Sequence, residues 1–402
     1  MIGSLYSGVS GLNATATAIT VVGDNIANVN TVAFKSNRSS FANILSQSLE
    51  GAGGSDIGRG VVFWGTTPVW TQGSLETTSN PTDLAINGRG FFILRDNSGA
   101  TYYSRAGEFR FDKNGYLINP DGLIVQGYEV DSNGTLGTIG DIKIPMGNNP
   151  PGATDELALT LNLNAQAESG DVYSTTITIY DSVGNPIPLT FTFTKTANPL
   201  EWDWATSIPS SYGSVTSGSG TLTFNADGSL PNGSDPTITI SLTNGASIPE
   251  ITWDLYDDTG VTNGEVTCFA SPSTTTFMTQ NGYPPGILQS ISVDERGIIT
   301  GLYSNGQMDF FQLALADFPS YWGLAKMGKN LYAETLTSGQ AMPGTPGSGR
   351  LGTISPSSLE LSNVDLASEF VKMITMQRAF QANSRVITTS DEILSDLINI
   401  KR

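Results

Sequence analysis

Apolar and polar residues alternate strictly through the middle of the chain. The longest alternating stretches are 157–163, 189–193, 238–242 and 251–255. A period of two predicts half-buried antiparallel strands, and the pairs Asp227-Gly228 and Asn244-Gly245 are suited to the tight turns between them. We therefore predict an antiparallel β-sandwich or barrel over residues 146–285. Similar alternation predicts more β structure over residues 60–145 and 287–353.

Both ends of the chain have a helical pattern instead. Near the N-terminus, apolar residues recur at steps of four and three, the spacing of a coiled-coil seam. These positions are Leu5, Val9, Leu12, Ala16, Ile19, Gly23 and Ile26. Near the C-terminus, one apolar row recurs every seven residues, at Leu366, Met373, Phe380, Ile387 and Leu394. A second row contains Phe370 and Ile398 but is interrupted by Gln377, Ser384 and Asp391.

These patterns predict two terminal helices, the second one capped by Ser362 or Asn363. We expect the helices to pair with each other as a coiled-coil-like inner domain, and then with neighbouring copies. A helical hairpin packed within a monomer is the alternative. The predicted fold class is therefore mainly β with α-helical ends.

Charge and proline positions predict how these elements form domains. Residues 146–285 contain 14 acidic residues but a single basic one, Lys195. Pro-Pro pairs mark both edges of this block, and paired prolines favour extended, semi-rigid connectors. We expect Pro150, Pro151, Pro284 and Pro285 to form two hinge linkers, with ordinary surface loops as the alternative. The predicted domains are a terminal helical domain (1–30 with 360–402), a β-rich middle domain (31–145 with 286–359) and an inserted acidic β-domain (146–285).

The composition excludes several kinds of chemistry. The chain has no histidine and one cysteine, Cys268, which excludes histidine-based catalysis, internal disulfides and cysteine-cluster zinc sites. A net charge of −18 argues against non-specific binding to nucleic acid or anionic lipid. No apolar run is long enough to span a membrane, and the first residues lack the pattern of a cleavable signal peptide. We expect Cys268 to be a small buried apolar residue.

Three short motifs resemble catalytic or metal sites. Residues 323–330 nearly match a phosphate-binding loop, but Asn330 replaces the hydroxyl residue that would bind Mg²⁺. Residues 258–260 match an aspartic-protease triplet without a second copy, which leaves a secreted acidic hydrolase as a remote alternative. Residues 131–134 lack the ligand spacing of a calcium loop. We therefore expect no catalytic, cofactor-binding or metal-binding residue, and no enzyme activity.

Motifs at both ends of the chain resemble one protein family. They are SGLNA at 10–14, DNIANVNT at 24–31, FK at 34–35, DLAINGRGFF at 83–92, SNVDL at 362–366 and QRAFQANS at 377–384. Together they resemble the signatures of bacterial flagellar rod and hook proteins. One departure is Ala33, where the family usually has glycine. The large inserted block favours a hook subunit, because rod subunits of this type are shorter and lack such a domain.

The resemblance implies a structural subunit that polymerises with its own copies into a curved, flexible tube. This tube would act as a universal joint between the motor with its rod and the filament, in the extracellular hook attached to the basal body. The expected assembly residues are those of the helical rows together with Asn25 and Asn28 of the N-terminal motif. The resemblance further implies export by the flagellar type III apparatus without cleavage. Implied partners are the distal rod protein, the hook cap and the hook–filament junction protein, and a rod or junction component is the alternative function.

Overall fold

The computed structural model describes residues 2–44, 47–48, 56–57, 59–131, 134–257 and 259–400. Asp258 and the side chain of Ile398 lie outside this described part. Residue contacts divide the chain into two compact units. The first unit contains Met1–Ile144, Ile291–Gly301 and Asp309–Arg402, and the second contains Pro145–Ser290 and Leu302–Met308.

The second unit is built on two facing β-sheets. One sheet has the order β18 (Gly213–Ser217), β20 (Thr237–Leu242), β21 (Ile251–Trp253), β14 (Glu156–Asn162) and β22 (Val266–Thr267), with β23 (Thr274–Gln280) also beside β14. The other has the order β15 (Val172–Tyr180), β16 (Pro186–Lys195), β17 (Glu201–Ser207) and β19 (Ser219–Thr223). Most pairs are antiparallel as predicted, but β14 runs parallel to β21 and to β22.

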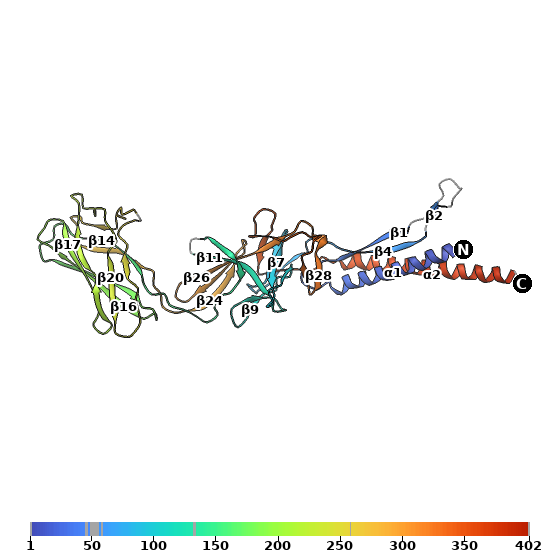
Figure 1. The fold of residues 1–402 in the computed structure, drawn as a ribbon, viewed down its shortest axis with the longest axis horizontal. Helices are drawn as coiled ribbons and strands as arrows, with labels where there is room; N and C mark the ends of the chain where they lie inside the picture. Colours follow the sequence, from blue (N-terminus) through green and yellow to red (C-terminus); the bar gives the residue numbers. More distant parts are fainter. Residues whose placement is uncertain are drawn as a thin grey trace. The chain divides into compact units, whose positions relative to one another are not determined.

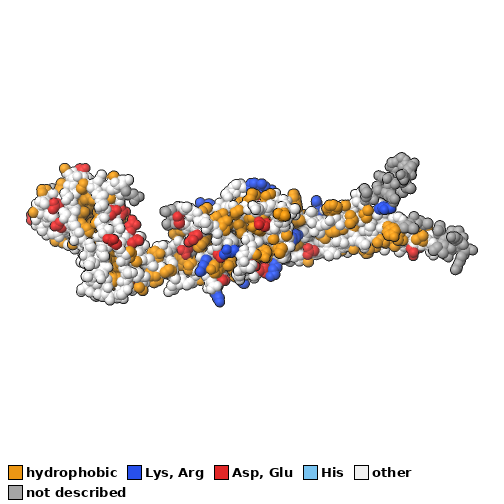
Figure 2. Space-filling model, viewed as in Figure 1, with side chains coloured by type: hydrophobic (Ala, Val, Ile, Leu, Met, Phe, Trp, Pro, Cys, Tyr) orange, Lys and Arg blue, Asp and Glu red, His pale blue; other side chains and the backbone are white. Residues whose placement is uncertain are grey.

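The alternating residues of the sequence form the core of this unit. Apolar residues from both sheets, including those of 157–163, 189–193 and 251–255, join in one buried cluster. Trp253 lies at its centre, with the rings of Phe191 and Trp204 at 5.0 and 5.2 Å. Cys268 is buried in the same cluster as predicted, and burial raises the pKa of its thiol. On the face drawn in Figure 2, acidic side chains are scattered over this unit.

A second β-structure forms the body of the first unit. Its main strand order is β26 (Met308–Leu313), β11 (Ile124–Val130), β7 (Phe91–Arg95), β8 (Thr101–Ser104), β29 (Leu331–Ala333) and β28 (Ala325–Gly328). Shorter strands beside it are β9 (Arg110–Phe111), β10 (Leu117–Ile118), β12 (Leu136–Asp141), β27 (Leu315–Asp317) and β30 (Met342–Gly344). Two small pairs, β6 (Leu84–Asn87) with β31 (Thr353–Pro356) and β5 (Leu75–Thr77) with β32 (Ser358–Glu360), lead towards the C-terminal helix.

Aromatic side chains fill the centre of this β-body. Phe91 makes edge-on contacts with the rings of Phe318 and Tyr321 at 5.8 and 5.3 Å, and Tyr103 contacts Phe318 at 4.8 Å. Desolvation by burial raises the pKa of Tyr103, Tyr321 and Tyr332 to about 12 each. These hydroxyls therefore stay protonated in the folded chain well above the ordinary tyrosine range.

Raising the pH from 10 to 12 is expected to destabilise the first unit. The unfolded chain releases these phenolic protons near pH 10, whereas the folded chain holds them to about pH 12. The unfolded state thus binds fewer protons across this window, and the free energy of unfolding falls as the pH rises. Denaturant unfolding across the window measures the slope. Tyr332→Phe should make that slope shallower, and an unchanged free energy of unfolding from pH 10 to 12 would contradict the assignment.

Two long helices and a β-hairpin complete the first unit. Helix α1 (Ile2–Ala27) and helix α2 (Leu366–Ile400) lie side by side and antiparallel, so that both chain ends lie at the same end of the pair (Figure 1). The hairpin of β1 (Asn37–Asn43) and β4 (Val61–Pro68) extends along α1. Between these strands lie the short β2 (Gln47–Ser48) and β3 (Asp56–Ile57). The fold class is therefore confirmed: mainly β, with helices at the two ends that pair with each other.

Candidate functional site

The contact between α1 and α2 is made by small residues of α1. Gly8, Gly11, Ala14 and Ala18 are buried along one face of the helix. A Cβ atom on Gly11 would lie 2.7 Å from Nδ2 of Asn383, and one on Gly8 would lie 3.0 Å from Cγ1 of Ile387. Real Cβ atoms do not make contacts as short as the one at Gly11. The glycine therefore permits a helix–helix approach that a larger residue would prevent.

The predicted register was wrong by one residue for the α1 row and for the second row of α2, whereas most of the first α2 row lies in the seam as predicted. On α1, the predicted row lies beside the buried one: Val9 and Ala16 are exposed, and Leu5, Leu12, Ile19 and Ile26 are half-buried. On α2, Met373, Phe380, Ile387 and Leu394 are half-buried as part of the seam. The second row of the seam, however, is Glu369, Met376, Asn383 and Ser390, and Phe370 is left 50% exposed. Leu366, which opens the first predicted row, is also exposed.

Several large apolar side chains therefore remain outside the helix pair. Exposed apolar residues are Tyr6 and Val9 on α1 and Leu366, Phe370, Val371, Ile374, Val386 and Ile393 on α2. The hairpin adds Trp64, which is 78% exposed, and Val62. Helix α1 carries a single charged residue, Asp24, in 26 residues. A long helix with one charge and an uncovered apolar row is typical of a surface that is buried in an assembly.

The hairpin is held directly against α1. The backbone N–H of Val61 donates to Oγ of Ser10 at 3.2 Å. Gly60 has a φ of +106°, and a Cβ there would lie 2.1 Å from the same oxygen. The hairpin backbone at Gly60 thus contacts α1 at Ser10, so closely that a side chain on Gly60 would not fit.

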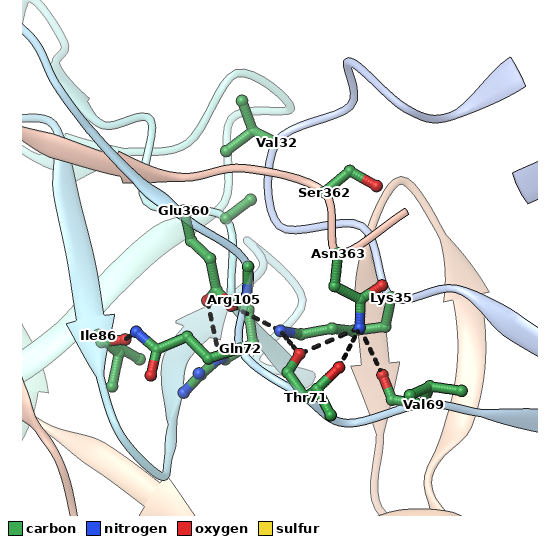
Figure 3. Close-up of polar contacts among 12 residues, drawn as sticks. Val32, Lys35, Val69, Thr71, Gln72, Ile86, Arg105, Glu360, Ser362 and Asn363 are labelled. Atoms are coloured by element: carbon green, nitrogen blue, oxygen red, sulfur yellow. Dashed lines mark hydrogen bonds and ion pairs between the residues drawn. The ribbon is translucent and has the colours of Figure 1, made fainter. Parts of the chain in front are cut away.

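A buried polar junction joins the bases of both helices to the β-body (Figure 3). The Glu360 carboxylate accepts hydrogen bonds from Nζ of Lys35 at 2.6 Å, Nε of Arg105 at 3.2 Å and the backbone N–H of Gly73 at 3.0 Å. The side chains of Lys35, Arg105 and Glu360 are 1%, 7% and 0% exposed. Burial lowers the pKa of Lys35, and the charge of Glu360 partly offsets this by favouring the ammonium form.

Two asparagines connect the chain segments around this junction. Asn363 accepts from the backbone N–H of Ser36 at 2.8 Å and donates to the carbonyl oxygens of Val69 and Thr71 at 2.9 and 3.0 Å. Asn25, which the sequence analysis selected, is buried and makes two 2.8 Å hydrogen bonds to the backbone of Asn37.

The base of α2 differs from the prediction. Asp365 caps the helix, because its carboxylate accepts from the backbone N–H of Ala367 at 2.9 Å. The predicted cap at Ser362 or Asn363 is therefore wrong. The other selected asparagine, Asn28, follows the last residue of α1 and donates to the carbonyl oxygen of Asp24 at 2.9 Å.

Ala33 occupies a position that favours glycine. Its φ is +55°, in the left-handed region, while its side chain is buried and its backbone N–H donates to the carbonyl oxygen of Glu360 at 2.7 Å. This conformation costs an alanine roughly 1–2 kcal/mol. The turn is therefore retained with alanine, and the surrounding hydrogen bonds offset the strain.

The proline linkers pack around a turn of the second unit. Gly184 has a φ of +85°, and a Cβ there would lie 2.5 Å from Cδ of Pro285 and 2.8 Å from Cβ of Pro151. The backbones of Gly152 and Tyr283 exchange two hydrogen bonds of 3.1 and 2.9 Å, so the linkers pair with each other. β13 (Asn148–Asn149) and β24 (Gly286–Val293) continue this pairing. The linkers thus form a two-stranded ribbon clamped at Gly184.

The three catalytic-looking motifs have structural roles or lie outside the described residues. Residues 323–330 continue from a short 3-10 turn, η1 (Tyr321–Gly323), into β28 rather than into a helix, and Lys329 pairs with Asp121 at 2.6 Å. In the described part of the chain, no group of three acidic or cysteine side chains could hold a metal ion. Asp258 is one of the residues left undescribed.

Sequence reasoning missed most of the polar junction. Glu360 and Arg105 were not selected, and Lys35 entered only as part of a family motif. One signal was available: only 14% of residues are charged, yet Lys35 and Glu360 each lie a few residues from a helix end. Their pairing spans 325 positions in the sequence, which no local pattern can report.

Comparisons with known proteins agree along the chain. The family described as "Flagella basal body rod protein" matches residues 5–35, and "Flagellar hook protein FlgE/F/G D1 domain" matches residues 85–166. "Flagellar basal body protein FlaE D2 domain" matches residues 162–283, and "Flagellar basal body rod FlgEFG protein C-terminal" matches residues 355–400. Among described residues, neither helix is long and apolar enough to cross a membrane.

Relatives match over nearly their whole length. The flagellar hook protein FlgE of Escherichia coli is 36% identical, with 98% of each chain covered, and that of Borreliella burgdorferi is 35% identical, with 100% of each covered. A crystal structure of Helicobacter pylori flagellar hook protein FlgE2 aligns with a TM-score of 0.54 at 15% identity, covering 71% of this chain and 100% of that one. Because relatives at 35–36% identity match it over nearly their full length, the chain belongs to the bacterial flagellar hook protein family.

Proposed function

We propose that the paired helices and the hairpin of this chain are the surfaces through which hook subunits join. The chain is a structural subunit of the flagellar hook, which transmits torque from the motor to the filament, and it is not an enzyme. It assembles with its own copies within the basal body structure. What needs assignment is which part of the chain makes those contacts.

One observation supports the helical ends: α1 pairs with α2 through small residues, and several large apolar residues of both helices stay uncovered. Phe370, Val371 and Ile374 are 50%, 64% and 52% exposed. Burying one such side chain contributes about 1.5–3 kcal/mol. Asn25 and Asn28 shape the base of α1. The proposed assembly residues of α1 are Leu5, Val9, Leu12, Ala16, Ile19 and Ile26. Those of α2 are Leu366, Phe370, Met373, Phe380, Ile387, Leu394 and Ile398.

We assign the remaining parts by the same reasoning. Residues 1–30 with 360–402 form the polymer core, 31–145 with 286–359 a middle domain, and 146–285 an outer domain. Acidic charge concentrated in the outer domain repels free subunits from one another. The linkers at Pro150, Pro151, Pro284 and Pro285 let the outer domain tilt as the tube bends. Because Gly184 clamps them, we place the bending just beyond the prolines rather than at them.

Export and further partners follow from family resemblance. We propose passage through the flagellar type III apparatus without cleavage, and contacts with the distal rod protein, the hook cap and the hook–filament junction protein. A chain whose one cysteine is buried and unpaired carries no internal disulfide that would oppose threading in an unfolded state.

Replacing Phe380 by aspartate is expected to abolish polymerisation while both β-structures stay folded. A charge at this half-buried seam position disrupts the helix pair and the surface built on it. Electron microscopy and light scattering of purified full-length protein measure assembly, and near-ultraviolet circular dichroism measures folding. Leu12→Asp tests α1 in the same way. Val261→Asp, at an exposed apolar residue of the second unit, is the control, and normal tubes from Phe380→Asp would overturn the assignment.

A further inference from the structure

A cavity in the β-body of the first unit has no assigned role. It opens to solvent, and its volume of about 270 Å³ is several times that of a water molecule. Lys35 and Arg105 of the polar junction are among its lining residues. Its lining also includes Trp70, Phe91, Tyr321, Trp322, Arg89 and Arg350.

The cavity offers hydrogen-bond donors that lack acceptors. The indole N–H of Trp70 is buried and has no partner within the described chain. Arg89 is exposed, makes no ion pair with a described carboxylate, and lies over the Tyr321 ring at 5.9 Å. Arg350 is 62% exposed and its Nε lies 3.6 Å from Asp317, too far for a hydrogen bond. Although Asp317 already forms an ion pair with Arg350, the indole N–H of Trp70 and the exposed guanidinium of Arg89 favour an occupant with acceptor oxygens and negative charge.

The rim of the cavity has the composition of a protein-binding surface. Trp322 is 72% exposed beside it, and Tyr321 and Arg89 form part of its wall. Tryptophan, tyrosine and arginine are the residues that most often dominate the energy of protein interfaces. An exposed tryptophan at the mouth of an arginine-lined cavity favours a protein side chain as the occupant.

We propose that this cavity receives an acidic side chain from a second copy of the chain in the assembled hook. The inference rests on the proposed function, because it takes the occupant from the polymer. Charge complementarity supports the choice: 37 acidic residues against 19 basic ones give every neighbour a surplus of carboxylates. All copies in a helical tube point the same way, so a pocket on one face of a subunit meets a different face of the next.

Reversing the charge at the cavity mouth tests the proposal. Full-length protein carrying Arg89→Glu and Arg350→Glu should need about tenfold more protein to polymerise, the loss expected of interface hot spots. The matched control is Arg110→Glu with Arg296→Glu, two exposed arginines outside the cavity. Circular dichroism confirms that each variant is folded. Polymerisation of the cavity variant at the control's concentration would overturn the proposal.

A photo-cross-linking amino acid at Trp322 provides a second test that does not depend on charge reversal. Irradiated polymer should yield a cross-link to a peptide of another copy that contains aspartate or glutamate, and reversing that acid should restore polymerisation of the Arg89→Glu, Arg350→Glu variant. Cross-links only within one chain, or to a peptide without an acid, would refute the proposal. These results are distinguishable from failure of the helix assignment, which Phe380→Asp tests separately.

Discussion

Replacing Glu360 by alanine is expected to lower the free energy of unfolding of the first unit by about 3–5 kcal/mol. The change removes the one carboxylate that pairs with both Lys35 and Arg105. These two cations would remain buried beside each other without a counter-charge, and the backbone N–H of Gly73 would lose its acceptor. Calorimetric unfolding of the full-length chain measures the loss.

The control for Glu360→Ala is another ion pair of the same unit. Asp121 pairs with Lys329 at 2.6 Å, but the lysine side chain is 71% exposed. Replacing Asp121 by alanine should lower the free energy of unfolding by no more than about 1 kcal/mol, because water readily solvates the Lys329 side chain that remains. If both variants lost the same free energy of unfolding, the buried junction would contribute no more to stability than an exposed ion pair. Polymerisation should also weaken in Glu360→Ala, since the bases of both helices are anchored through this carboxylate.

The second large effect is expected from Gly184→Ala in the linker clamp. The added Cβ would lie within 2.8 Å of both Pro285 and Pro151, and alanine resists a φ of +85°. We expect the turn to move away from the prolines and the paired linkers to separate more often. Hydrogen exchange at the backbone amides of Gly152 and Tyr283, which bond across the linkers, should then become about tenfold faster or more.

Gly170 provides a matched control for the clamp. Its φ is +96°, but an added Cβ there would have no atom within 4 Å. Gly170→Ala therefore carries the same kind of backbone strain without a collision at the linkers. Exchange at Gly152 and Tyr283 should stay at the wild-type rate in this variant. If both variants accelerate exchange equally, the effect comes from general destabilisation and the clamp assignment is wrong.

The sequence predicted the two β-structures and the terminal helices because their patterns are local. Alternation with a period of two identified many core positions of the second unit, including Trp253 and Phe191, but missed others such as Trp202 and Trp204. Alternation carries no information about strand direction, so the parallel pairing of β14 with β21 and β22 was missed.

The helix register failed for a different physical reason. We assigned the larger apolar residues to the intrachain seam, because burial of large side chains usually dominates. In α1 the seam is instead made by Gly8, Gly11 and Ala18, where close backbone approach replaces bulky packing. The row containing Val9 thus lies beside the seam rather than in it, and we propose that it contacts further copies.

The polar junction lay beyond reach for a third reason. Lys35, Arg105 and Glu360 come from three distant segments, and each alone reads as an ordinary surface charge. Only the folded chain places them together, at 1–7% exposure for the cations and 0% for the carboxylate.

The antiparallel pairing of α1 with α2 has a consequence for timing. The two partners are the first and last helices of the chain, and they meet through contacts such as Gly11 with Asn383, 372 positions later. If the helix pair is the joining surface, as proposed, a truncated chain lacks one half of that surface. Only a copy that contains both ends could then enter the tube.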